Sequence, residues 1–211
     1  MTFRARASTS SRTPEPPTPR CLVLDAMGVI FAAADDVAEL LVPFVRAAGG
    51  DATSVEAAYL DASLGAIDAD EFWMRVGLDT SVEDEYLSKH ALVPGAREFM
   101  VRANESELPI WCLSNDVARW SEKLRESFGI ARLLAGVVIS SDVRARKPDP
   151  IIYQSLLDRS GLRASDVVFV DDRQRNVEAA SALGIRSMRF STAYGYRQLA
   201  VDLLPAPLEE C

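Results

Sequence analysis

Hydrophobic positions in this chain form short, nearly continuous runs separated by amphipathic stretches with helical spacing. Such runs are typical of strands buried on both faces of a sheet. They lie at residues 21–24, 109–113, 136–140, 166–170 and 185–190. After residue 93 they alternate with predicted helices, two of which open at Pro94 and Pro150. This alternation predicts right-handed crossovers and a parallel sheet with a helical layer on each face, so the expected fold class is α/β with three layers.

The stretch between residues 32 and 92 shows no strand-like alternation and predicts helices throughout. The expected helices cover residues 36–48, 53–63, 68–76 and 83–89. We expect Pro43 to kink the first helix, Thr53 or Ser54 to cap the second, and Asp68 to cap the third. The sequence therefore predicts an α-helical domain inserted into the α/β core.

These patterns predict three parts in the chain. The α/β core consists of residues 21–31 and 93–211, and residues 32–92 form the inserted helical domain. Residues 1–20 are rich in Pro, Ser, Thr and Arg. Such a composition buries no core, so we expect a disordered tail there.

Composition narrows the classes of function. The chain has 211 residues and 48% hydrophobic residues, with no apolar run near the ~18 residues that a membrane-spanning helix needs. Cys21, Cys112 and Cys211 form no disulfide framework, which favours a reducing cytoplasm. The only histidine is His90. Histidine-based metal sites and Ser-His or Cys-His nucleophiles are therefore not expected.

The negative charge is concentrated in one part of the chain. The net charge is −8, yet residues 32–92 alone hold thirteen Asp and Glu against Arg46, Arg75 and Lys89. An acidic protein is a poor partner for a nucleic-acid backbone. We therefore expect neither nucleic acid nor a membrane as a partner.

Polar side chains follow three of the predicted strands. Asp25 ends the first, Ser114 and Asn115 follow the second, and Asp171 with Asp172 follows a later one. The carboxyl ends of parallel strands share one edge of a sheet, so these residues are expected to meet in one crevice. Lys147 precedes the helix at Pro150. Each residue alone could be a helix cap or a solvated charge, and Arg144 and Arg146 are expected to be solvated. Together they supply a nucleophile, a hydroxyl donor, a cation and two acids.

These residues resemble the motifs of the haloacid dehalogenase superfamily of hydrolases, in the branch with a helical cap and a Rossmann-like core. Asp25 with Gly28 is similar to the first motif, and Ser114 to the second. Lys147, within Arg146–Tyr153, is similar to the third, and Asp171–Asp172, within Val170–Gly184, to the fourth. The resemblance extends over residues 21–192.

The resemblance implies a Mg²⁺-dependent hydrolase of a small phosphate monoester, acting through an aspartyl-phosphate on Asp25. The implied Mg²⁺ ligands are Asp25, the backbone carbonyl of Met27 and Asp172, with Asp171 as a further candidate; Asn176 aligns with an outer acid of the family. The implied phosphate-binding residues are Ser114, Asn115 and Lys147, of which Ser114 and Lys147 are also implied to be catalytic.

Met27 departs from the family pattern. Phosphatases of this family usually carry a second aspartate at this position, which protonates the leaving group and later activates water. A thioether does neither, and such acid–base help is worth about 100- to 10,000-fold in rate. Three interpretations stay open. The protein is a phosphatase with an easy leaving group or with an acid supplied by the cap or by water, a metal-independent 2-haloacid dehalogenase, or an inactive relative with a binding or regulatory role.

The acidic helical domain adds a hypothesis about the substrate. A negative field above a phosphate site repels multiply charged anions. The sequence then favours a small monophosphate with hydroxyl or amine groups over bisphosphates and nucleotides. The alternative is that these acids form a solvated outer face. The sequence does not indicate an oligomeric state.

Overall fold

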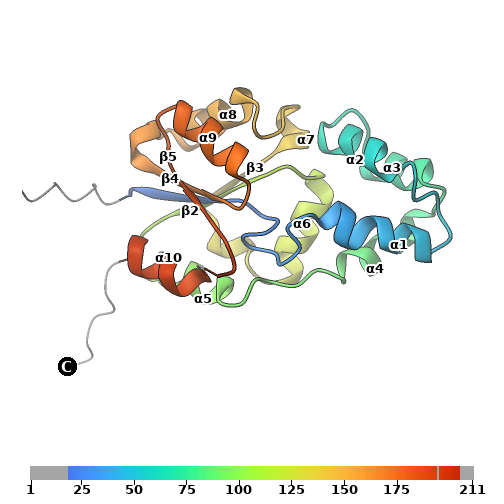
Figure 1. Ribbon diagram of the computed structural model, residues 1–211, viewed down its shortest axis with the longest axis horizontal. Coiled ribbons are helices and arrows are strands. Elements are labelled where there is room, and N and C mark those ends of the chain that lie inside the picture. The colour runs from blue at the N-terminus through green and yellow to red at the C-terminus, as the bar shows by residue number, and fades with distance from the viewer. Residues whose placement is uncertain (1–18, 194, 205–211) are drawn as a thin grey trace, which may run out of the picture.

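The computed structural model describes residues 19–193 and 195–204 (Figure 1). Apart from its last two residues, the tail expected at residues 1–20 lies outside the described residues, as does Cys211.

A five-stranded parallel sheet forms the centre of the molecule (Figure 1). Its strands are β1 (Cys21–Leu24), β2 (Ile110–Ser114), β3 (Gly136–Ile139), β4 (Val167–Asp171) and β5 (Arg186–Arg189). The strand order is β3-β2-β1-β4-β5, so β1 is central, with Val23 aligned to Trp111 on one side and Phe169 on the other. The predicted parallel α/β sheet is confirmed.

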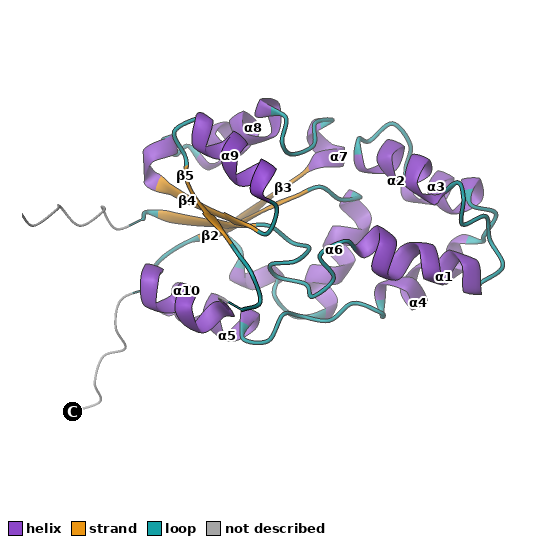
Figure 2. Cartoon of the chain, in the orientation of Figure 1, coloured by secondary structure: helices purple, strands orange, loops and turns teal. Residues whose placement is uncertain are grey.

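Helices cover both faces of the sheet (Figure 2). One face carries α5 (Ala96–Glu105), α6 (Ala118–Ser127) and α10 (Gly195–Leu203), and the other carries α8 (Pro150–Ser160) and α9 (Gln174–Ala182). Alternate residues of each strand point to opposite faces. Leu22 and Leu24 therefore join one buried hydrophobic cluster, while Cys21 and Val23 join the other. This arrangement gives the three layers that the sequence predicts.

The helix α10 has no counterpart among the predicted elements. Its buried residues are Tyr196, Leu199, Ala200 and Leu203, which have the i, i+3, i+4, i+7 spacing of an amphipathic helix. The Tyr196 hydroxyl also donates a hydrogen bond of 2.9 Å to the carbonyl oxygen of Val29. The C-terminal helix is thereby attached to the loop that follows β1.

Residues 32–92, the helical segment, contain the predicted helices and lie beyond the carboxyl ends of the strands, to the right in Figure 1. They comprise a π-helical turn (Val37–Leu41), α1 (Val42–Ala47), α2 (Val55–Ser63), α3 (Ala69–Arg75) and α4 (Glu83–Leu87), with a short 3₁₀ turn at Thr80–Val82. Pro43 lies in the first turn of α1, where its missing N–H interrupts the helical bonding and marks the joint between the two helical forms.

The predicted cap of α3 is confirmed, whereas that of α2 is wrong. Asp68 accepts a hydrogen bond of 2.8 Å from the N–H of Glu71. Ser54 occupies the cap position of α2 but makes no side-chain cap, because its hydroxyl donates to Asp51 instead. The Asp51 carboxylate also accepts from the N–H and hydroxyl of Thr53 and organises this turn.

Glu83 joins the helical segment to the core. One of its carboxylate oxygens accepts hydrogen bonds from the indoles of Trp73 and Trp120, at 3.1 and 2.8 Å, and from the guanidinium of Arg119. Its other oxygen lies 2.9 Å from Nζ of Lys123. Trp73 belongs to the helical segment and the other three donors to α6. The two regions therefore share one buried polar junction.

Aromatic packing surrounds this junction. The Trp120 ring lies 5.4 Å from that of Trp73 and 5.3 Å from that of Tyr86, measured between ring centroids. The same hydrophobic cluster extends from the face of the sheet through these rings into the helical segment. The segment is therefore packed against α6 as part of one core. Across the described parts of the chain, no helix has the length and apolar character needed to cross a membrane.

Replacement of Glu83 tests the junction. Burial opposes ionisation of Glu83, but hydrogen bonds from Arg119, Lys123 and the two indoles outweigh it and lower its pKa. Since Arg119 and Lys123 are partly exposed, we expect Glu83→Gln to reduce the free energy of unfolding by about 2 kcal/mol at pH 7. A lowered pKa stabilises the fold above the unfolded-state value of about 4.3, so the deficit should shrink as the pH falls below about 4.

Urea unfolding across this pH range provides the measurement. Glu85→Gln is the matched control, because the Glu85 side chain is 66% exposed and its ion pair is with Lys89, in the turn that follows α4; it should cost less than about 0.5 kcal/mol. Equal losses in the two variants would contradict the junction.

Candidate active site

The topology of the sheet creates a crevice beside β1. From β1 the chain passes to β2 and β3 on one side, and returns to β4 on the other. Ligands bind at such a switch point, outside the carboxyl ends of the strands. A cavity of about 720 Å³ lies there, lined by Asp25, Met27 and Ser114 of the core and by Asp36, Glu56 and Tyr59 of the helical segment.

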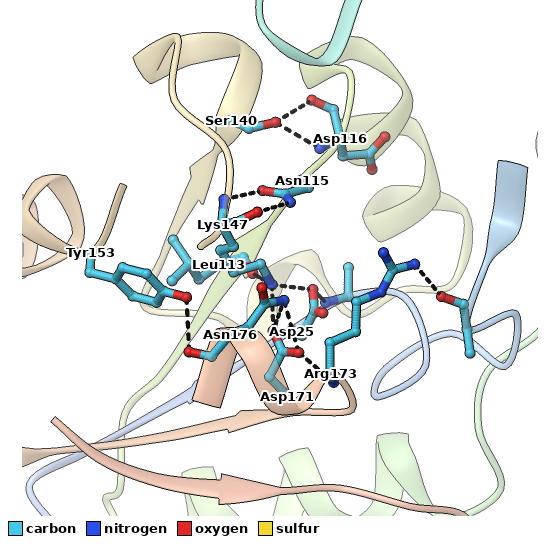
Figure 3. Close-up of polar contacts among 12 residues, drawn as sticks. Asp25, Leu113, Asn115, Asp116, Ser140, Lys147, Tyr153, Asp171, Arg173 and Asn176 are labelled. Atoms are coloured by element: carbon cyan, nitrogen blue, oxygen red, sulfur yellow. Dashed lines mark hydrogen bonds and ion pairs between the residues drawn. The ribbon is translucent and has the colours of Figure 1, made fainter. Parts of the chain in front are cut away.

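Lys147 lies between two carboxylates at the base of this cavity (Figure 3). Its Nζ is 2.7 Å from Oδ1 of Asp25 and 2.9 Å from Oδ2 of Asp171, and it donates a third bond of 2.7 Å to the carbonyl oxygen of Leu113. Burial disfavours the charged amine, but the two carboxylates outweigh burial and raise the pKa of Lys147. The lysine therefore stays cationic.

The two carboxylates respond differently to this environment. Burial and the charge of Asp171 raise the pKa of Asp25 well above its usual range, against the effect of Lys147. Burial also opposes ionisation of Asp171, but Lys147 and the N–H of Arg173 outweigh it and lower the pKa of Asp171. Asp25 additionally accepts a bond of 2.6 Å from the N–H of Ala26.

Asp172 completes a cluster of three carboxylates. Oxygen atoms of Asp25, Asp171 and Asp172 lie within 4.8 Å of one another. Both oxygens of Asp171 already accept hydrogen bonds from Lys147, Asn176 or the N–H of Arg173. Oδ1 of Asp172, in contrast, is buried and has no partner among the described residues. Burial and the charge of Asp171 raise the pKa of Asp172, and they outweigh the opposing effect of Arg173 and Lys147.

This donor set fits Mg²⁺, which takes one or two carboxylates together with other oxygen atoms. Of the two candidate acids, Asp172 offers the free oxygen. The backbone carbonyl of Met27 is a further oxygen of the loop after β1. In the short bridge to Phe31, the carbonyl of Ala26 accepts from the N–H of Phe31, and the N–H of Gly28 donates to the carbonyl of Phe31. That bridge leaves the Met27 carbonyl unused.

Gly28 allows Asp172 to approach the loop after β1. Its φ is +77°, and a Cβ at this position would lie 2.6 Å from Oδ2 of Asp172. A side chain here would therefore be strained and would also displace the Asp172 carboxylate. This explains in physical terms why a glycine stands three residues after Asp25.

Ser114 and Asn115 lie at the cavity in different environments. The Ser114 hydroxyl oxygen is buried and has no partner within the described residues, so it is available to a ligand. The Asn115 side chain instead bonds to the backbone of Lys147, accepting from its N–H at 2.7 Å and donating to its carbonyl at 2.9 Å (Figure 3). Asn115 thus holds the loop that carries the lysine, and its role in phosphate binding stays a prediction.

Two arginines line the cavity, and the expectation for Arg146 was wrong. Its guanidinium lies 5.5 Å from the centroid of the Tyr59 ring and donates to the Ser63 hydroxyl, so it is not simply solvated. Sequence reasoning missed Arg173, which donates a bond of 3.0 Å to the carbonyl of Ala34. Both arginines connect the core to the helical segment. Arg144 is exposed, as expected.

The acids of the helical segment divide into two groups. Many lie outside the cavity in ion pairs, such as Asp61 and Glu71 with Arg75, or Glu85 with Lys89. The acids that line the cavity are Asp35, Asp36 and Glu56. The ion-paired acids therefore form a solvated outer face, whereas the cavity-lining acids lie at the site. Asp36 is 6% exposed, and burial together with Asp35 raises its pKa to about 6.

Comparison with known sequences agrees with this geometry. A family model described as haloacid dehalogenase-like hydrolase matches residues 20–184. A phosphoglycolate phosphatase of Pectobacterium atrosepticum is 28% identical over 107 residues, which cover 51% of this chain and 45% of that protein. One from Pseudomonas fluorescens is 23% identical over 194 residues, covering 84% and 71%. The chain spans about half the length of most of the curated relatives it matches.

Solved structures share the fold. A haloacid dehalogenase family enzyme from Bacteroides thetaiotaomicron, in complex with magnesium and inorganic phosphate, has a TM-score of 0.72 at 17% identity, over 86% of this chain and 98% of that one. The L-2-haloacid dehalogenase of Xanthobacter autotrophicus, with chloropropionic acid covalently bound, has a TM-score of 0.60 at 21% identity, over 90% and 86%. At these identities the likeness concerns the fold.

Replacement of Gly28 by alanine tests the close approach of Asp172. Gly77 is a matched control, because its φ is +74° and nothing lies within 4 Å of its Cβ position. Gly77→Ala should cost about 1 kcal/mol of unfolding free energy from backbone strain alone. Gly28→Ala should cost about 1–3 kcal/mol more, since the methyl group also meets the carboxylate. Equal losses in urea unfolding would show that Asp172 does not crowd this position.

Proposed function

Because the chain belongs to the haloacid dehalogenase-like hydrolases, we propose that it is a Mg²⁺-dependent phosphatase of small phosphate monoesters. The observation that supports this proposal most directly is the cluster of Asp25, Asp171 and Asp172 around the buried Lys147. Three carboxylates and one cation suit a site that holds a divalent ion and a phosphoryl group together.

In this proposal Asp25 is the nucleophile. Its Oδ attacks phosphorus, the bond to the leaving oxygen breaks, and the phosphoryl group is transferred to the carboxylate. Water then hydrolyses the aspartyl-phosphate and releases inorganic phosphate. Lys147 offsets the charge of Asp25 and of the incoming phosphate, so that the two anions can approach each other. The Ser114 hydroxyl donates to a phosphoryl oxygen.

Asp25, the backbone carbonyl of Met27 and Asp172 would hold Mg²⁺, with Asp171 as a further candidate. When bound, the ion supplies positive charge at the phosphoryl oxygens. The hydrogen bonds that Asp171 already accepts favour Asp172 as the direct ligand. Asn176 donates to both oxygens of Asp171 and orients it.

The helical segment acts as a cap in this proposal, above a core of residues 21–31 and 93–211. It forms one wall of the cavity, so a substrate's leaving group would contact it while the phosphate contacts the core. A volume of about 720 Å³ suits a small metabolite. The cavity combines Arg146 and Arg173 with Asp35 and Glu56, which favours a substrate that carries hydroxyl groups besides one phosphate.

A metal-independent 2-haloacid dehalogenase also uses an aspartate nucleophile. The unpartnered oxygen of Asp172 favours the phosphatase, because it leaves a carboxylate free to hold Mg²⁺, which a metal-independent dehalogenase does not need. The two activities are separated by the assay below.

We predict that the protein releases phosphate from 4-nitrophenyl phosphate in the presence of Mg²⁺ and releases no chloride from 2-chloropropionate. Asp25→Asn should lower phosphate release at least about 1,000-fold, because the nucleophile is lost. Asp158→Asn, at an exposed position of α8, should leave it unchanged. Chloride release without metal would replace the phosphatase by a dehalogenase, and turnover of neither compound would support a binding role.

Mg²⁺ binding gives a readout without turnover. Calorimetry should detect binding to the wild type, and Mg²⁺ at about 100 times its Kd should raise the free energy of unfolding by about 2.7 kcal/mol. Asp172→Asn should weaken the affinity at least about 10-fold, whereas Asp158→Asn should not. Wild-type affinity in Asp172→Asn would remove this residue from the proposed ligand set.

A further inference from the structure

Hydrolysis of an alkyl phosphate requires a proton that the base of the cavity does not supply. The leaving oxygen departs with an electron pair as an alkoxide, which is a strong base and leaves slowly unless it is protonated. Met27, the side chain nearest in sequence to Asp25 on the cavity wall, carries a thioether without an acidic proton. Lys147 is held between two carboxylates that raise its pKa, so it retains its protons.

The part of the cavity wall formed by the helical segment contains a buried carboxyl group. Asp36 lines the same cavity as Asp25 and Met27, on the side of the helical segment, and is 6% exposed. The other acids of that wall, Asp35 and Glu56, are exposed to solvent. The Tyr59 hydroxyl already donates to the carbonyl of Asn115, and burial raises its pKa well above the usual value. Asp36 is therefore the buried acid of that wall, and its raised pKa keeps part of it protonated at weakly acidic pH.

The structure holds Asp36 in place from both sides. Its Oδ2 lies 3.4 Å from the hydroxyl of Tyr86, a buried residue of α4. Two residues before Asp36, the carbonyl of Ala34 accepts a hydrogen bond from Arg173, which follows Asp171 and Asp172 in the chain. Since α4 is joined to α6 through Glu83, the segment that carries Asp36 is fixed to the core. Figure 3 shows Arg173 reaching away from Asp171 towards this segment.

The charged and titratable groups around Asp36 come from four other parts of the chain and from its own loop. They are Asp35 beside it, Tyr59 of α2, Tyr86 of α4, Asp116 of the loop after β2, and Arg173. Burial and Asp35 raise the pKa of Asp36 to about 6, while Tyr86 and Arg173 act in the opposite direction. Asp116 is itself buried, with a pKa raised to about 8, so near neutral pH it adds little negative charge.

We propose that Asp36 is the general acid and base of the reaction, provided by the helical segment in place of a residue beside Asp25. This assignment depends on the phosphatase function proposed above. In the first step Asp25 forms its bond to phosphorus, the bond to the leaving oxygen breaks, and the Asp36 carboxyl gives that oxygen its proton. In the second step the Asp36 carboxylate takes a proton from water while the water oxygen attacks phosphorus. The bond between phosphorus and Asp25 breaks, and Asp36 is again protonated.

The dependence of rate on the leaving group tests this assignment. 4-Nitrophenolate leaves without a proton, whereas the alkoxide of 2-hydroxyethyl phosphate needs one. Asp36→Asn, which keeps the size of the side chain, should lower kcat/KM for 2-hydroxyethyl phosphate about 100- to 10,000-fold and change the first step for 4-nitrophenyl phosphate little. The first step is read as the burst of 4-nitrophenolate, which also reports that the variant is folded.

Asp84→Asn is the matched control. Asp84 belongs to the same helical segment, is 82% exposed and lies outside the cavity, and the variant makes the same replacement of a carboxyl by an amide. It should leave the rates of both esters unchanged. The wild-type kcat/KM for 2-hydroxyethyl phosphate should also fall as the pH rises through the pKa of Asp36, because the acid form is lost, and Asp36→Asn should lack this decline.

Three results would overturn the assignment. Equal losses for both esters in Asp36→Asn would indicate a structural role, and no loss for the alkyl ester would indicate another acid. Hydrolysis of aryl but not alkyl phosphates by the wild type would show that no general acid protonates the leaving group. In each case the phosphatase function stands if Asp25→Asn abolishes release from the aryl ester. A wild type that releases phosphate from neither ester overturns both proposals.

Discussion

A single buried cation between two carboxylates is the constraint on which the site depends. Removing Lys147, Asp25 and Asp171 from water is expensive, and their attraction compensates for this only when all three are held at hydrogen-bonding distance. The strands β1 and β4 bring the two acids together because they are neighbours in the sheet. Asn115 positions the lysine by bonding to its backbone on both sides. The order of the strands and the loop before α8 together hold Lys147 between Asp25 and Asp171.

The sheet and the base of the site were predictable because their signals are local. A buried parallel strand is a hydrophobic run, and the residue that ends it must lie at the edge where ligands bind. Asp25, Ser114 and Asp171 could therefore be assigned to one crevice before any contact was known. The superfamily resemblance was carried by the same residues, and the family comparison confirms it.

The residues that join the helical segment to the core were not predictable in this way. Glu83 meets Trp120 across 37 positions, and Arg173 meets Ala34 across 139. The hydrophobic pattern of the sequence does not predict such pairs, because they depend on how two packed surfaces meet. Arg146 looked solvated for the same reason: its stacking partner Tyr59 lies in another part of the sequence. Ser54 failed as a cap because Asp51, only three residues away, competes for its hydroxyl.

The central position of β1 has a consequence for how the chain is made. This strand is synthesised before the other four strands, yet it pairs through Leu22 with Ile110 on one side and Val168 on the other. One edge of this buried strand therefore stays without a partner until β2 has been synthesised and the other until β4 has been, and long-range parallel pairing of this kind is slow. An unfinished chain exposes an apolar strand on which other chains can aggregate. We therefore expect a demand for chaperones during translation as a consequence of placing β1, the strand that ends at Asp25, at the centre of the sheet.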